Sequence, residues 1–204
     1  LHGNGEIIDR WAPELSWYTN RGVSVLLPEY RGYGRSAGRP SARAIVADVR
    51  AATDRLLALD TVDADRLILH SRSLGGGFAA QLIGTHAPAA VILGSSFTSL
   101  PDAARELLPV PNFVVRDKLP VEAELRGYAG PVLILHGQDD AVIPVTHARR
   151  NAAAAAHATL VVYERTGHND MPHGHGRWED IAAFLAANHL LDGPGAPARS
   201  TPGR

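Results

Sequence analysis

The sequence predicts an α/β fold in which a mostly parallel sheet carries helices on both faces. Short apolar runs alternate with helical patterns along the 204 residues, which form one domain. The runs are apolar at consecutive positions, as expected for strands buried on both faces. Polar, glycine-containing segments follow the ends of these runs, where parallel sheets place their functional sites.

Five apolar runs have the length and composition of buried strands. They cover residues 23–28, 67–70, 89–94, 131–136 and 159–163. We expect each run to occupy the interior of the sheet, with helices between successive strands.

Four segments have helical patterns and cover residues 41–59, 78–83, 147–156 and 177–188. The first of these is amphipathic, and Pro40-Ser41 is a suitable start for it. Its apolar face is formed by Ile45, Val49, Ala52, Leu56 and Leu59.

Composition excludes several classes of function. The formal net charge of −1 provides no positive field to attract nucleic acid or an anionic membrane. The absence of cysteine excludes disulfides, thiolate catalysis and cysteine-bound zinc. No apolar run is long enough to span a membrane, and no signal peptide is visible. The default expectation is a cytoplasmic protein, but the compartment stays open because an upstream signal or anchor would lie outside this sequence.

The segment Ser71-Arg72-Ser73-Leu74-Gly75-Gly76-Gly77-Phe78 connects the second apolar run to a helical pattern. Small residues two positions before and after Ser73 are typical of a nucleophile elbow, a turn too tight for bulky neighbours. Such a turn exposes the serine hydroxyl at a helix N-terminus, which favours developing negative charge. The alternative is a glycine-rich turn that carries a surface serine.

A serine nucleophile needs a base, and the base needs an orienting acid. Two later apolar runs end in segments that offer these groups. The segment after run 131–136 contains Asp139 and Asp140, and the segment after run 159–163 contains His168. Each candidate follows a different strand, as a site assembled on a parallel sheet requires.

Five motifs, in this order along residues 1–191, carry a resemblance to a known family. They are His2-Gly3-Asn4-Gly5, Tyr30-Arg31-Gly32-Tyr33-Gly34-Arg35-Ser36, Ser71 to Gly76, His136-Gly137-x-x-Asp140-x-x-x-Pro144 and Gly167-His168-Asn169-Asp170. With them the chain resembles the α/β-hydrolase superfamily, in particular its small-lid serine hydrolases of the esterase, thioesterase and peptidase-like kind.

The resemblance implies Ser73 as nucleophile, His168 as base and Asp140 as orienting acid, with Asp139 as the alternative acid. It implies an oxyanion hole formed by the backbone N–H groups of Leu74 and Asn4, with Gly5 as the alternative to Asn4. The implied reaction is cleavage of a carboxylic ester, thioester or amide through an acyl-enzyme, without a cofactor.

Other interpretations use the same residues. One is a catalytically silent binding protein with a hydrolase fold, and another is an acyltransferase with the same triad. His168, His173, His175 and Asp170 could suggest zinc, but their loop lacks a regular helical face, so we expect no metal. The expected partner is a small-molecule or acylated substrate, with no nucleic acid; the sequence leaves the oligomeric state open.

The resemblance also implies the domain organisation. Residues 1–191 would form the hydrolase domain, with a short lid at about residues 97–130, and residues 192–204 would be a disordered tail. The apolar lid residues would form an acyl-binding wall or simply pack onto the sheet: Leu107, Leu108, Phe113, Val114 and Val115.

In the superfamily fold a strand that ends at the position of Leu1 lies between the strands represented here by residues 23–28 and 67–70. We therefore expect an N-terminally truncated fold that lacks its first strands and leaves an open position in the sheet. The alternatives are closure of the two neighbouring strands, or a partner chain that fills the position.

Overall fold

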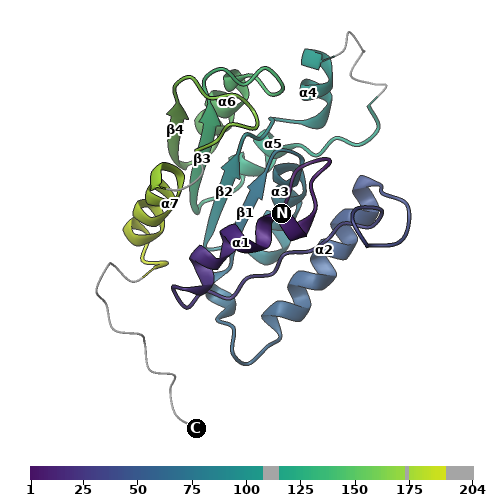
Figure 1. Cartoon of the computed structure of the whole chain (residues 1–204), viewed down its shortest axis with the longest axis vertical. Helices are drawn as coiled ribbons and strands as arrows, with labels where there is room; N and C mark the ends of the chain where they lie inside the picture. The colour runs from purple at the N-terminus through teal and green to yellow at the C-terminus, as the bar shows by residue number, and fades with distance from the viewer. Residues whose placement is uncertain (108–114, 173–174, 192–204) are drawn as a thin grey trace.

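The computed structural model describes residues 1–107, 115–172 and 175–191, and these residues form a parallel sheet with helices on both faces (Figure 1). The four strands follow the order β1-β2-β3-β4, with bounds β1 (Ile68–Arg72), β2 (Ala90–Gly94), β3 (Pro131–Gly137) and β4 (His157–Tyr163). All three pairings are parallel. The predicted fold class is confirmed.

The central strands are buried on both faces, as their continuous apolar sequences predict. Every residue of β2 is buried, and in β3 only Pro131 is partly exposed. The two strands are in register from Val91 opposite Val132 to Gly94 opposite Leu135. Their carboxyl ends therefore lie at one edge of the sheet, where loops from different strands meet.

Alternate strand residues face two separate cores. Ile92, Leu133 and Leu135 lie in the core beneath helices α1 (Ile8–Thr19) and α7 (His175–Ala187). Val91 and Ile134 lie in the opposite core. The helices on that side are α2 (Ala42–Leu57), α3 (Leu74–His86), α5 (Val121–Arg126) and α6 (Val145–Ala154).

Helix α2 begins where the sequence predicts. The Ser41 side chain caps it by accepting a hydrogen bond from the N–H of Ala44. Ile45 and Val49 are buried, as their spacing indicates. The prediction that Leu59 belongs to the apolar face of this helix is wrong, because the helix ends at Leu57 and Leu59 is 53% exposed beyond it.

The prediction of a buried strand at residues 23–28 is also wrong. This segment has no strand hydrogen bonding, and Val25 and Leu26 are each 37% exposed. A strand needs a neighbour to satisfy its backbone groups, and within the described residues no strand pairs with the outer edge of β1.

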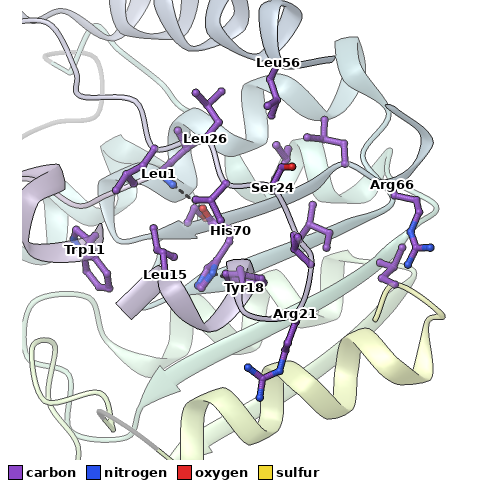
Figure 2. A pocket seen from close by; sticks show the side chains of 18 of the residues that line it. Leu1, Trp11, Leu15, Tyr18, Arg21, Ser24, Leu26, Leu56, Arg66 and His70 are labelled. Carbon is purple, nitrogen blue, oxygen red and sulfur yellow. Dashed lines mark hydrogen bonds between the residues drawn. The ribbon is translucent and has the colours of Figure 1, made fainter. Parts of the chain in front are cut away.

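A cavity of about 920 Å³ separates this segment from β1, as Figure 2 shows. Among the residues that line it are Leu15 and Tyr18 of α1, Leu26 of the 23–28 segment and Leu56 of α2. Leu1 lies at one end, where its N–H donates to His70 O (2.7 Å) and its carbonyl accepts from Arg72 N (3.0 Å). These two bonds hold Leu1 alongside Ser71 at the outer edge of β1.

The predicted lid region, residues 97–130, contains helix α4 (Leu100–Leu107) and helix α5. Val121 and Leu125 of α5 are buried against α3, so this half of the region packs onto the core. Leu108, Phe113, Val114 and the tail 192–204 lie outside the described residues. No helix in the described part of the chain is both long and apolar enough to cross a membrane.

Candidate active site

Ser73 occupies the turn between β1 and α3 with a backbone conformation of φ +50° and ψ −118°. Few residues other than glycine adopt a positive φ. Hydrogen bonds hold the turn on both sides: Ser73 N donates to Gly94 O (2.8 Å), and Ser96 Oγ donates to Ser73 O (3.1 Å). Ser73 therefore lies at the carboxyl end of the sheet, at the first turn of a helix.

Close packing explains the small residues around Ser73. A Cβ atom on Gly75 would collide with the carbonyl oxygen of Leu1, and one on Gly76 would collide with Ser96 Oγ. Ser71, two positions before Ser73, is buried and donates to Ile92 O (3.1 Å). The glycines thus allow helix α3 to approach the N-terminal loop and the end of β2.

The structure brings Ser73, His168 and Asp140 together in one hydrogen-bonded chain. His168 Nε2 lies 3.1 Å from Ser73 Oγ, and His168 Nδ1 lies 2.7 Å from Asp140 Oδ2. The three residues follow β1, β4 and β3 respectively. Because parallel strands end at the same edge, side chains 95 and 28 residues apart in the sequence meet there.

Asp140 is buried and held as a carboxylate by several donors. Its Oδ1 accepts from Val142 N (2.9 Å) and Ile143 N (2.7 Å), while His136 Nε2 lies 3.3 Å from Oδ2. Burial alone would raise the pKa of this carboxyl group. The hydrogen bonds from His136, His168 and Ile143 outweigh burial and bring the Asp140 pKa well below its usual range.

The neighbouring carboxylates lie elsewhere. Asp139 is exposed, and its backbone N–H donates to Thr166 O (2.9 Å). The Asp170 side chain folds back toward Gly167 in the loop that carries His168: a Cβ on Gly167 would be 2.7 Å from Asp170 Oδ2. Of the two acids that follow β3, Asp140 is the one that contacts His168.

Of the four residues considered for zinc, only His168 and Asp170 have described side chains. No group of three or more histidine, cysteine, aspartate or glutamate side chains lies there with the geometry to hold a metal ion. His173 and the His175 side chain are outside the described residues.

Asn4 and Leu74 lie on the two segments that flank Ser73. In the hydrogen bonds of the described residues, the backbone N–H groups of Asn4 and Leu74 have no acceptor. The Asn4 side chain accepts from Tyr33 Oη (2.7 Å), and Gly5 follows with φ +72°, a conformation that suits glycine. Leu74 directly follows Ser73, and the start of the Asn4 loop approaches the same turn, since a Cβ on Gly75 would collide with Leu1 O and lie 2.7 Å from His2 O.

The histidine of the N-terminal motif supports this loop. His2 is buried, stacks on Tyr30 with ring centroids 3.9 Å apart, and places Nε2 3.1 Å from Glu29 Oε1. Burial lowers the pKa of His2, although Gly3 O and Glu29 oppose this shift. The Glu29 contact and the role of His136 were not predicted, because both depend on residues brought close only by the fold.

The three arginines of the sequence motifs make ion pairs. Arg31 pairs with Asp48 on α2, and Arg72 pairs with Glu6. The exposed Arg35 lies 3.2 Å from Asp9.

Comparison with known proteins identifies the family. Residues 1–121 match the family described as serine aminopeptidase, S33, and residues 111–192 match the one described as TAP-like protein. The chain is 39% identical over 176 residues to the uncharacterized protein MT2364 of Mycobacterium tuberculosis, covering 83% of this chain and 62% of that protein. It is 32% identical over 185 residues to the α/β-hydrolase domain-containing protein WAV2 of Arabidopsis thaliana, covering 79% and 60%. The chain thus spans less than two thirds of these relatives.

Solved structures share the fold at low sequence identity. The ferulic acid complex of Est1E from Butyrivibrio proteoclasticus has a TM-score of 0.76 at 19% identity, covering 93% of this chain and 87% of Est1E. The monoacylglycerol lipase of Paleococcus ferrophilus has a TM-score of 0.68 at 17% identity, covering 93% of both chains. Since the first family match covers more than half of the 204 residues, the chain belongs to the serine aminopeptidase S33 family of α/β-hydrolases.

Proposed function

We propose that this protein is a serine hydrolase that cleaves a carboxylic ester, thioester or amide through an acyl-enzyme on Ser73. The observation that carries the proposal is the chain of hydrogen bonds from Ser73 Oγ through His168 to Asp140, at 3.1 and 2.7 Å. These distances are within reach for proton transfer to a base and for orientation of that base by an acid.

In the first step His168 Nε2 accepts the Ser73 proton while Oγ attacks the carbonyl carbon of the substrate. The resulting imidazolium donates through Nδ1 to Asp140, whose low pKa keeps it ionised. His168 then gives its proton to the leaving alcohol, thiol or amine. In the second step the same histidine activates water, which releases the acid and regenerates Ser73.

The N–H groups of Leu74 and Asn4 would stabilise the negative oxygen of each tetrahedral intermediate. Their lack of other acceptors in the described residues supports this role. Removal of one such donor typically lowers turnover about 10²–10³-fold. The Leu74 donor also belongs to the first turn of α3, where the helix dipole favours an anion.

We infer a small-molecule or acylated substrate; among proteins that share this fold, Est1E is described with bound ferulic acid and the Paleococcus ferrophilus protein as a monoacylglycerol lipase. Hydrolysis and acyl transfer use the same Ser73, His168 and Asp140 chemistry. Product analysis with water competing against added alcohols and amines separates the two reactions.

The proposal is tested by covalent labelling of Ser73 together with measurement of substrate turnover. We expect a fluorophosphonate probe to label the parent chain at Ser73, and Ser73→Ala to lose both labelling and nearly all turnover of an ester, thioester and peptide panel. Asp140→Asn should lose several orders of magnitude, though less than Ser73→Ala. Ser16→Ala, a change on the exposed side of α1, is the matched control.

Two outcomes would contradict the proposal. Equal turnover in Ser73→Ala and the parent would exclude Ser73 as nucleophile. A folded parent chain that neither reacts with the probe nor hydrolyses any member of the panel would favour the catalytically silent binding protein.

A further inference from the structure

Arg72 is the last residue of β1 and precedes Ser73, yet its side chain reaches two loops that come from opposite ends of the chain. Only 15% of this side chain is exposed. A buried guanidinium is retained only when its donors are satisfied, so its partners indicate what it does.

On one side Arg72 holds the loop of the proposed base. Its Nη2 donates to the backbone oxygen of His168 (2.8 Å) and to Asn169 Oδ1 (2.8 Å). The first bond restrains the backbone that carries the imidazole. The second fixes the next residue, so the loop is held at two adjacent points.

On the other side Arg72 forms an ion pair through Nη1 with Glu6 Oε1. The second oxygen of Glu6 accepts from Gly3 N (2.6 Å) and from Trp11 Nε1 (2.9 Å). The Glu6 carboxylate therefore closes the turn that presents the Asn4 N–H, and it is itself only 18% exposed.

Gly3 allows this close approach. A Cβ on Gly3 would lie 3.0 Å from Glu6 Oε1 and 3.1 Å from Arg72 Nη1, tighter than ordinary van der Waals contact. The N-terminal turn, the ion pair and the end of β1 are therefore packed as one unit. The planar fork of arginine suits this arrangement because it donates in two directions at once, which a lysine ammonium does less well.

We propose that Arg72 and Glu6 are positioning residues that hold the Asn4 loop and the His168 loop in one mutual geometry beside Ser73. The inference rests on the proposed function, because it concerns the donor and the base of that same reaction. Both groups act on a single tetrahedral intermediate, so a shift of one loop relative to the other weakens catalysis even when each loop stays folded.

The first test compares steady-state kinetics of Arg72→Met, Glu6→Gln and the double variant. We expect kcat to fall about 10- to 100-fold in each with little change in KM, since a displacement of about 1 Å can cost about 10² in rate. The double variant should lose no more than the stronger single variant, because residues that act as one unit are not additive. Glu6→Gln keeps the shape and the acceptor oxygen, so it remains informative if Arg72→Met folds poorly.

The second test is chemical rescue. Arg72→Ala should regain turnover when guanidinium is added at millimolar concentration, whereas equal sodium chloride or urea should not restore it. Arg50→Met is the matched control: Arg50 is a half-buried arginine that donates to a backbone oxygen of another element, Gln81 O (2.8 Å), away from the site. We expect Arg50→Met to keep the turnover of the parent.

Hydrogen exchange tests the positioning without turnover. In Arg72→Met the amides of residues 2–6 and 166–170 should exchange faster together, and in Arg50→Met neither group should change. A kcat within twofold of the parent in Arg72→Met and Glu6→Gln, or unchanged exchange in both loops, overturns the inference. If the parent shows no Ser73-dependent chemistry but the two loops still loosen together, the proposed function fails while the coupling of the loops stands.

Discussion

Ser73 has a strained backbone conformation that its neighbours impose. Its φ of +50° with ψ of −118° lies outside the regions that residues with a Cβ normally occupy. Such conformations typically cost about 1–3 kcal/mol and persist only where surrounding contacts impose them. Here the contacts are the hydrogen bonds to Gly94 and Ser96 and the close approach of Gly75 to Leu1.

This strain predicts different stabilities for two variants that lack the Ser73 hydroxyl. Ser73→Gly should unfold at higher urea concentration than Ser73→Ala, by about 1 kcal/mol in free energy of unfolding, because glycine adopts the same backbone without a Cβ. Ser73→Ala keeps the Cβ and is the matched control. Equal midpoints for the two variants would mean that the turn is relaxed.

Single-residue predictions from the sequence depended on how local the signal was. Ser73 and His168 stand in short motifs at strand ends, and the structure brings them together with Asp140. The pairing of Arg72 with Glu6 could not be predicted, since 66 residues separate them and neither belongs to a repeating pattern.

At the scale of elements, α1 docks on β1 through a polar contact. Tyr18 Oη lies 3.0 Å from His70 Nδ1 under the α1–α7 layer. Burial, with a smaller contribution from nearby positive charge such as that of Arg177, lowers the pKa of His70 to about 3. The contact therefore requires a neutral imidazole.

Stability should consequently fall as pH decreases. Below about 6.5 the unfolded chain binds a proton at His70. The folded chain does not bind this proton until the pH is near 3, so unfolding becomes easier across that interval. We expect His70→Gln to show a smaller drop in urea midpoint between pH 7 and pH 5 than the parent. His157→Gln, at an exposed histidine of β4, is the control, and equal drops in all three proteins would contradict the prediction.

The elements that the sequence did not predict have physical reasons. Helix α1 contains Pro13 and begins without a side-chain cap, so it lacks the usual start signal. Helix α5 has six residues, too few for a clear period. Residues 23–28 have strand composition, but an apolar run does not reveal whether a partner strand lies beside it.

At the scale of the whole molecule, the two faces of one sheet contribute side chains to two separate hydrophobic cores. Leu133 on β3 faces the core under α1 and α7, and its neighbour Ile134 faces the other. Both are fully buried or nearly so, at 0% and 1% exposure. Loss of packing on either face therefore weakens the central strands that position both Ser73 and Asp140.

Shortening a buried side chain at the centre of the sheet should destabilise the whole fold. We expect Leu133→Ala to lower the free energy of unfolding by about 2–5 kcal/mol through lost burial and a residual cavity. Leu59→Ala, at a leucine that is 53% exposed, should change it by about 0.5 kcal/mol or less. Urea denaturation followed by far-ultraviolet circular dichroism measures both, and similar losses in the two variants would argue against the described burial.

All three tryptophans lie on the two helices of a single face. Trp11 and Trp17 belong to α1 and Trp178 to α7, and the rings of Trp17 and Trp178 stack with centroids 5.0 Å apart. Tryptophan fluorescence therefore reports on that layer of helices and does not report directly on α2, α3, α5 and α6. An experimenter who watches fluorescence alone would record the detachment of two helices and could mistake it for the melting of the entire molecule.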